Sequence, residues 1–581
     1  MSRFQPLTCR IDDREELRPM TQAHPGNADH LTRRDLLRKG ATTAVTVSAL
    51  DLFSYFNAYG MPQNTKAAKI AKAVTEEHEP HFMITWYIEG GWESYDMFSP
   101  VITPNNVLHR LPPEKLSDET YRVLKFGEPG YGIYKHGNIR YGYLAENGKE
   151  LLPEMAVLSS MDTGEFHSGE RLKVHMGSYN LQLQADREDD ERSYMQAFSE
   201  VYGQPYILPH LSWHYWLSDG ELNEQQYTGR KGYYSNLGPA HAHTIYAGTP
   251  ATMKSFLNRM QATSSDTVNR QIEKFLDNLT PSLMKDANLE VAKSFHSASS
   301  VYDNLANAGR NLDRTMLTRL FSDPELRAKF DIKPADELIT YSSINGNKAR
   351  TKFSPATNVQ AMMTYEMMRA GLSCAFFIET RNIREFDSHA DRKSLWRGKE
   401  RTPHGQPDQT ASMNEQLWKP LKALVKLLKE TPYKNTGKSL YDLTTIVLTS
   451  EFGRTIKGDV DAIRAMKISD EDKQKQIDGQ DISQHWRVTS AAFLGGKTRG
   501  NFQVGSVGEK TLLPIPLMPD GSLDPAYNAV TGDLKPGATQ SKQSHLPNHG
   551  DVYATALHLA DIAPKGRGRN DRAPLTYFKR T

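Results

Sequence analysis

Runs of apolar and β-branched residues alternate with amphipathic segments along this chain, and that alternation restricts its fold more than any other feature. Helical periodicity covers residues 358–369 and 414–429. Strands that are apolar throughout and separated by helices are typical of a parallel sheet covered on both faces. We therefore predict a doubly wound, mostly parallel α/β sheet with helices on both faces. The strand candidates are residues 81–88, 155–160, 372–378, 444–450 and 488–494.

Three segments interrupt the alternation. Residues 250–332 contain polar amphipathic helical patterns and no strand candidate, which predicts a helical insertion over one side of the sheet. Residues 456–483 are highly charged, and residues 506–548 are rich in Pro, Gly and Ser, so both are expected to be insertions or long loops. The α/β domain is expected to span residues 81–581 and to include all three.

The N-terminal segment, residues 1–60, has the layout of a twin-arginine export signal. Arg33 and Arg34 are followed by leucines, a lysine and the modest apolar run 41–56. The alternative is a basic cap on an ordinary amphipathic helix. The export interpretation places the protein in the periplasm or otherwise outside the cytoplasm, with the twin-arginine translocase as a partner during export. Residues 61–80 are polar and are expected to be a linker.

Composition narrows the classes of function further. The 581 residues carry a formal net charge of +2, which does not indicate a nucleic-acid partner. The leader run is shorter than the roughly 20 apolar residues that span a bilayer, and no later run reaches that length, so no stable transmembrane span is expected. Of the two cysteines, Cys9 lies in the leader and Cys374 in a strand candidate, where a packed core cysteine is expected.

Acids, histidines and arginines follow the ends of the predicted strands. Because the carboxyl ends of parallel strands meet at one edge of a sheet, these residues are candidates for a shared site. Carboxylates and imidazoles there suit a divalent metal, and arginines suit an anionic substrate. The candidates, in chain order, are Asp96, His167, Ser168, Arg171, Asp387, His389, Glu451, Arg454 and His485.

Each candidate also has a structural interpretation. Asp96, and the pair Asp387 and His389, could be solvated loop residues, and Ser168 could be a helix N-cap. Glu451 directly follows a buried run, where an acid needs a partner or a metal; Arg454 could be that partner.

Several of these segments resemble a large bacterial domain-of-unknown-function family that is exported by the twin-arginine route and grouped with the alkaline phosphatase and sulfatase superfamily. The resemblance covers residues 80–565. Its most specific part is Ser-Glu-Phe-Gly-Arg-Thr at 450–455, supported by the Gly-Gly…Asp strand end at 90–96, Phe-Asp-Ser-His-Ala at 386–390, and Tyr-Ala-Thr at 553–555.

The resemblance implies a metal centre at the carboxyl edge of the sheet. Asp96 is similar to the first-strand aspartate ligand, Asp387 and His389 to the Asp/His ligands, Glu451 to the acid of the phosphatase Asp-His pair, and His485 to the late histidine. The stretch 167–179 is similar to the sulfatase signature, with His167 at the position of the modified cysteine and Arg171 at that of the signature arginine.

The chain also departs from that superfamily. His167 is neither Ser, Thr nor Cys, which leaves Ser168 as a substitute nucleophile. Phe452 stands where phosphatases carry a histidine ligand, and Gln484 where family members often carry an aspartate. One divalent ion (zinc, calcium or manganese) is therefore expected in preference to two.

Two functional hypotheses follow. The first is an exported metal-dependent hydrolase that acts on small anionic phosphate or sulfate esters. The second is a non-catalytic envelope binding or assembly protein with a degenerate hydrolase fold and no metal. A redox enzyme is disfavoured, since the chain lacks cysteine clusters and a dinucleotide-binding glycine pattern.

Overall fold

The computed structural model divides into two units, residues 1–48 and 49–581, and every residue described below belongs to the second. The leader and linker predictions therefore lie outside the described residues. The structure describes residues 80–101, 113–115, 121–123, 134–165, 170, 173–175, 177, 193–203, 206, 210–212, 242–244, 320–332, 338–341, 352–355, 357–380, 386, 413–454, 467, 469–470, 485–563 and 572–580.

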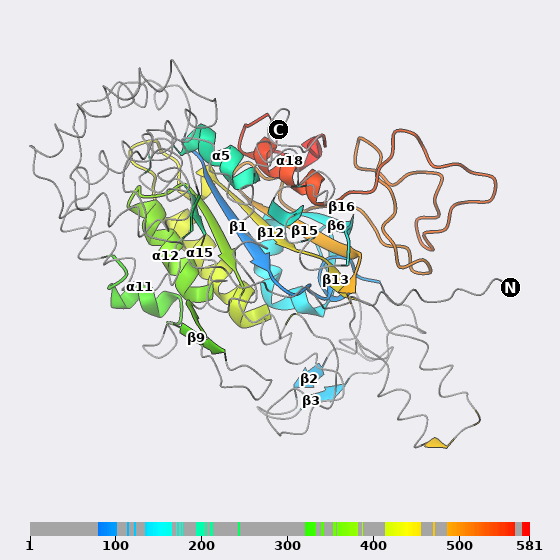
Figure 1. Ribbon diagram of the computed structural model, residues 1–581, viewed down its shortest axis with the longest axis horizontal. Coiled ribbons are helices and arrows are strands. Elements are labelled where there is room, and N and C mark those ends of the chain that lie inside the picture. Colours follow the sequence, from blue (N-terminus) through cyan, green and yellow to red (C-terminus); the bar gives the residue numbers. More distant parts are fainter. Residues whose placement is uncertain are drawn as a thin grey trace, which may run out of the picture. The chain divides into compact units, whose positions relative to one another are not determined.

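An eight-stranded sheet forms the centre of this unit (Figure 1). Every pair of neighbouring strands is parallel except the two pairs that involve β15, so this strand alone runs against the others. The sequence prediction of a mostly parallel α/β sheet is confirmed. The order across the sheet is β16 (Phe502–Val504), β6 (Ala156–Asp162), β15 (Val488–Gly495), β12 (Thr444–Ser450), β1 (Phe82–Ile88), β11 (Ala375–Glu379), β7 (His210–Ser212) and β8 (Ala242–Thr244).

The strand β1 lies between β12 and β11, and all seven of its residues are buried. Its register pairs Thr85 with Val447 of β12 and with Phe377 of β11. Side chains on both faces of such a strand are buried on folding. The run is therefore apolar and β-branched, without alternating polar residues. The five longest strands coincide with the five apolar runs of the sequence.

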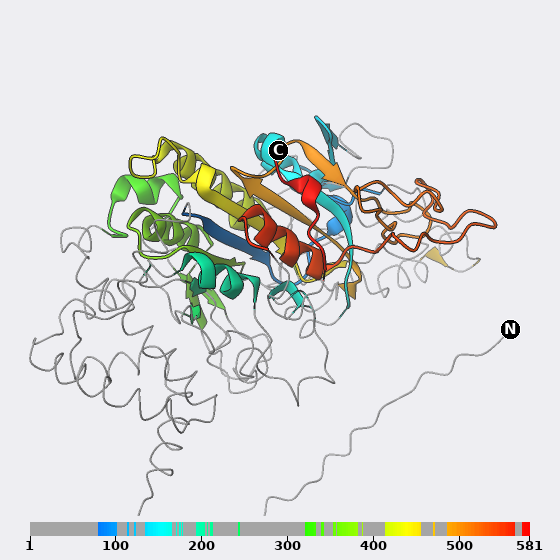
Figure 2. The same cartoon turned by 90° about the horizontal axis from the view of Figure 1, so that it is seen from above.

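Helices cover both faces of the sheet, and the two views of Figures 1 and 2 agree on their placement. The helices α5 (Tyr194–Tyr202) and α18 (His549–Leu559) pack together over one face. On the other, α12 (Thr357–Arg369) packs on β11 and against α15 (Lys419–Glu430). The doubly wound arrangement predicted from the sequence is therefore confirmed.

The helix boundaries differ in detail from the sequence patterns. The pattern at 414–429 contains a π-helical turn, Asn414–Trp418, before α15 begins. Asn548 is the N-cap of α18, and Asp551, the third helical residue, closes a capping box with it.

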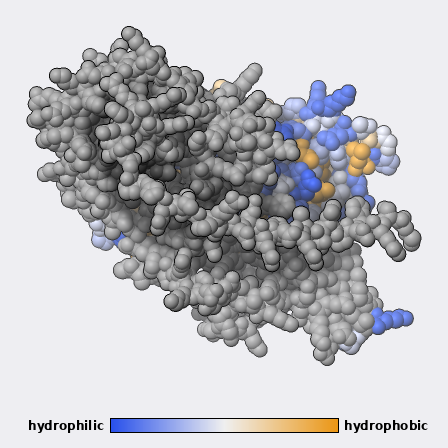
Figure 3. All heavy atoms as spheres, viewed as in Figure 1, coloured by the Kyte–Doolittle hydropathy of each residue, from blue (hydrophilic) through white to orange (hydrophobic). Residues whose placement is uncertain are grey.

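Of the predicted helical insertion, only residues 320–332 are described, and they contain the short helix α11 (Pro324–Lys329). Residues 505–548 contain turns and isolated bridges in place of helices and strands, as their Pro, Gly and Ser content predicted. Figure 3, in the view of Figure 1, shows a largely polar surface over this part of the molecule with some apolar side chains. Val530 and Leu534 are exposed in this segment.

None of the helices within the described ranges has the length and apolar character needed to cross a membrane.

The remaining described elements are mostly short. These smaller elements are η1 (Ser94–Asp96), β2 (Pro113–Lys115), β3 (Tyr121–Val123), β4 (Tyr134–His136), β5 (Ile139–Tyr141), η2 (Tyr143–Glu154), β9 (Leu338–Tyr341), β10 (Lys352–Pro355), η5 (Tyr441–Leu443), β13 (Gly453–Arg454), β14 (His485–Trp486) and η6 (Thr576–Phe578).

Candidate functional site

The sheet topology brings several distant segments to one edge. The carboxyl ends of β1, β12, β11 and β6 share this edge with the amino end of the antiparallel β15. The start of α18 joins them, because the Asp162 N–H donates to the Pro547 carbonyl at 2.7 Å. In open α/β sheets, ligands bind at this edge.

A glycine turn follows β1 at this edge. Gly90 and Gly91 have φ values of 100° and 83°, and residues other than glycine rarely adopt such backbone angles. The turn is held from the neighbouring strand β12 and the residues after it. The Gly90 N–H donates to Glu451 Oε1 at 2.9 Å, and the Trp92 N–H donates to Ser450 Oγ at 3.1 Å.

Arg454 and Phe452 complete this clamp around the turn. Arg454 is fully buried; its Nε donates to the Gly91 carbonyl at 3.2 Å and its Nη2 donates to the Gly90 carbonyl. The Phe452 ring packs so closely on Gly91 that a β-carbon there would lie 2.6 Å from it. The Ser-Glu-Phe-Gly-Arg string, the most specific part of the sequence resemblance, thus holds the glycine turn in place.

Glu451 is fully buried, and both of its carboxylate oxygens accept hydrogen bonds. Oε1 accepts from Gly90, and Oε2 accepts from the Tyr87 hydroxyl at 2.8 Å. The sequence argument that an acid directly after a buried strand needs a partner is confirmed. The hydrogen bonds described for Arg454 run to the glycine turn, and its two expected roles, pairing with Glu451 or holding a substrate anion, stay predictions.

Buried carboxyl groups gather along this edge beyond Glu451. Six glutamate and aspartate residues at the end of β11 or in the segments that follow β1, β6 and β12 are each at most 8% exposed. Arg454 is buried at the same edge, and Lys173 pairs with Glu170 at 2.6 Å. The six acids are Glu89, Glu93, Asp96, Glu170, Glu379 and Glu451.

His549, which is not among the residues predicted for the site, lies within this edge. It is buried, and its Nε2 lies 2.9 Å from the backbone carbonyl of Glu451. Burial lowers the pKa of His549, while the nearby Glu170 charge opposes that change. The sequence signal that could have found it is its position beside Asn548, a residue type that caps helices, since a helix start was to be expected at the sheet edge.

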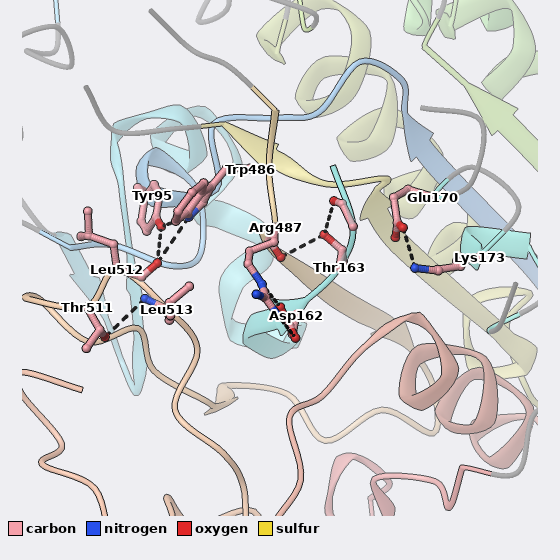
Figure 4. A network of polar contacts seen from close by, with 11 residues as sticks. Tyr95, Asp162, Thr163, Glu170, Lys173, Trp486, Arg487, Thr511, Leu512 and Leu513 are labelled. Atoms are coloured by element: carbon pink, nitrogen blue, oxygen red, sulfur yellow. Dashed lines mark hydrogen bonds and ion pairs between the residues drawn. The ribbon is translucent and has the colours of Figure 1, made fainter. Parts of the chain in front are cut away.

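Ion pairs and aromatic side chains tie the start of β15 to the same edge (Figure 4). Arg487 donates from Nε and Nη2 to the two carboxylate oxygens of Asp162 at 2.5 and 2.6 Å. Trp486 Nε1 donates to the Tyr95 hydroxyl at 2.7 Å, and that hydroxyl donates to the Leu512 carbonyl at 2.8 Å. These contacts fix the long loop at 505–548 to the first-strand segment.

The three predicted metal ligands that are described do not form a metal centre by themselves. Asp96 ends η1 and is buried, and Glu451 holds the glycine turn. His485 is half-buried; its Nδ1 lies 2.8 Å from the Glu165 carbonyl, and its ring lies 4.4 Å from that of Phe452. Within the described part of the chain, no group of three or more His, Cys, Asp or Glu residues is arranged to hold a metal ion.

The other predicted site residues lie outside the described residues. They are His167, Ser168, Arg171, Asp387 and His389.

Taken together, the fold and site define an α/β protein with a mostly parallel sheet and a buried, acid-rich carboxyl edge. No protein-family model and no curated protein matches the sequence. Among solved structures, this one is similar to the crystal structure of the lipoteichoic acid synthase LtaP from Listeria monocytogenes. The TM-score is 0.32 and the sequence identity 8%, over 91% of this chain and 81% of that chain. A likeness at this level adds nothing to the fold assignment, which rests on the strand order.

Proposed function

We propose that the protein is an exported, metal-dependent hydrolase that acts on small phosphate or sulfate esters at the carboxyl edge of its sheet. The observation that carries the proposal is the gathering of six buried carboxyl groups and the buried His549 at the carboxyl edge of the sheet. Taking ionised carboxylates out of water costs several kcal/mol per group. A bound divalent cation would offset part of that cost.

The acid-rich edge fits a cation in charge and in donor type, since carboxylate and imidazole groups hold zinc, calcium and manganese. Asp96, Glu451 and His485 would need Asp387 and His389 to complete a ligand set. When bound, one such ion would polarise the ester and stabilise negative charge that develops in the transition state.

The chain's own residues would supply the nucleophile and hold the anionic group of the substrate. His167 or Ser168 would attack the ester or position a water molecule, and Arg171 would hold the anionic group through charge-assisted hydrogen bonds. Arg454 serves the site indirectly, because its guanidinium holds the glycine turn that carries Glu89–Asp96.

A specific observation also favours the second hypothesis, a non-catalytic envelope binding or assembly protein. Glu451 and Arg454 both hold the glycine turn, which is a structural role that needs no catalysis. A fold of this kind supports many functions, so the two hypotheses are separated by an experiment on the site.

The test is a screen of aryl phosphate and aryl sulfate esters with the full chain, before and after treatment with EDTA. The hydrolase predicts turnover that EDTA removes, that a divalent ion restores, and that Asp387→Ala abolishes. A folded protein that cleaves none of these esters with any added divalent ion would refute the hydrolase hypothesis and support the binding-protein hypothesis. Glu146→Gln is a matched control, since that glutamate is partly exposed and pairs with Lys149.

A further inference from the structure

The imidazole of His549 presents an unused lone pair at the carboxyl edge. Because the Glu451 carbonyl oxygen can only accept, His549 Nε2 carries the proton of that 2.9 Å hydrogen bond. Nδ1 therefore carries the lone pair. This atom is buried and has no hydrogen-bond partner in the described part of the chain.

A carboxylate oxygen of Glu170 is in the same condition. The Glu170 side chain is 4% exposed, and its Oε1 accepts from Lys173 Nζ at 2.6 Å, as Figure 4 shows. Its Oε2 is buried and has no partner among the described groups. After burial, the Glu170 charge has the largest effect on the pKa of His549, ahead of the charges of Lys173 and Glu451. Both residues lie beside the end of β6, because a β-carbon on Gly164 would overlap Glu170 Oε1, and the Asp162 N–H donates to the carbonyl of Pro547, two residues before His549.

Two neighbouring buried acceptors without a donor are costly, at about 1–3 kcal/mol for each unsatisfied group. A metal ion satisfies both at once, and imidazole nitrogen with carboxylate oxygen is a ligand pair that zinc uses. Metal-binding histidines almost always donate their other ring N–H to a carbonyl or carboxylate. His549 already makes that bond to the Glu451 carbonyl.

We propose that His549 Nδ1 and Glu170 Oε2 are two ligands of a divalent transition-metal ion at the carboxyl edge, beside Glu451. This adds two residues to the ligands named for the proposed function. It rests on that function in placing a divalent ion at this edge, and it does not require ester hydrolysis.

The position of His549 as the first residue of α18 bears on the charge balance. The amino end of a helix carries partial positive charge, which opposes a nearby cation. Asp551 lies in the first turn of α18, with one carboxylate oxygen 2.8 Å from the Asn548 N–H and the other 2.8 Å from His545 Nε2. Its carboxylate, with that of Glu170, offsets the helix end.

Two substitutions separate metal binding from folding. His549→Gln retains a donor for the Glu451 carbonyl and removes the Nδ1 lone pair. Glu170→Gln retains an acceptor for Lys173 and replaces the Oε2 oxygen by a neutral amide nitrogen, which does not bind a metal ion. Glu170→Gln is therefore expected to keep the fold of the metal-free protein while it removes a ligand.

The experiment is a titration of the EDTA-treated full chain with Zn²⁺, followed by calorimetry and by the change in Tm. Wild type is expected to bind zinc and to gain thermal stability, since a ligand of the folded state stabilises it. Both variants are expected to lose that gain. Glu366→Gln is the control, because Glu366 is also buried and also pairs with a cation three residues on, Arg369; it should keep the zinc response.

The outcomes distinguish this inference from the proposed function. Wild-type zinc affinity in either His549→Gln or Glu170→Gln overturns the inference, and so does a wild-type protein that binds no zinc. If Asp387→Ala loses zinc while Glu170→Gln keeps it, only the inference fails. If zinc binds through Glu170 and no ester is cleaved, only the proposed function fails.

Discussion

Replacing Gly91 by alanine tests the claim that the residues after β12 hold the glycine turn after β1. Gly91 has a φ of 83°, and a β-carbon there would lie 2.6 Å from two atoms of the Phe452 ring and 3.2 Å from Arg454 Nε. Phe452 is fully buried, so its ring cannot move into solvent. Gly91→Ala therefore adds both backbone strain and a steric overlap.

The two costs can be sized separately. A left-handed backbone costs a residue with a β-carbon about 1–2 kcal/mol. Overpacking a well-filled core costs about 1–3 kcal/mol more. Gly91→Ala is therefore expected to lower the free energy of unfolding by about 2–5 kcal/mol. Gly371→Ala is the matched control, since Gly371 has a φ of 66° and nothing within 4 Å of the added carbon, so only the backbone cost applies.

The assay is urea unfolding of wild type, the two alanine variants, Phe452→Ala and the double variant Gly91→Ala/Phe452→Ala. The overlap predicts a favourable coupling, in which Gly91→Ala costs less once the ring is gone. If Gly91→Ala costs no more than Gly371→Ala, or if its cost is unchanged in the Phe452→Ala background, the described contact between Phe452 and the turn does not exist in solution.

Three further predictions concern other parts of the chain. Burial, with a smaller effect from Lys497, lowers the pKa of His81 from 6.5 to about 3. Between pH 6.5 and pH 3, His81 is therefore protonated in the unfolded chain and neutral in the folded protein. The free energy of unfolding falls as the pH drops through this range, by up to about 1.4 kcal/mol per pH unit. In His81→Gln, urea unfolding across that range should show a shallower dependence, and an unchanged slope would contradict the assignment. Glu451→Ala leaves the Tyr87 hydroxyl and the Gly90 N–H without their acceptor and should lose about 2–5 kcal/mol in the same assay, against at most a small loss for Glu146→Gln. Arg33→Lys with Arg34→Lys should leave the protein in the cytoplasm when cell fractions are compared by immunoblot; normal export would refute the leader interpretation.

The sheet was predictable because its long strands are apolar on both faces. The runs that became β1, β6, β11, β12 and β15 needed no partner information to be recognised. The reversed direction of β15 was not predictable, since it depends on what lies across the sheet and not on the run itself. The three-residue strands β7, β8 and β16 were missed because three residues show no periodicity.

The candidate site was predictable in location more than in detail. Glu451 was identified because an acid after a buried run must be satisfied, and the structure shows what satisfies it. The hydrogen bond from Arg454 to the Gly91 carbonyl joins residues more than 360 positions apart, which no local pattern encodes. His549 was missed for a similar reason, because its pairing with the Glu451 carbonyl spans 98 positions.

The most direct test of the central claim is the divalent metal content of the full chain, purified without chelators and measured by elemental analysis. The acid-rich carboxyl edge predicts one tightly held divalent ion per chain that is lost in Asp387→Ala. A folded protein that holds no divalent ion, with or without that substitution, would contradict the claim.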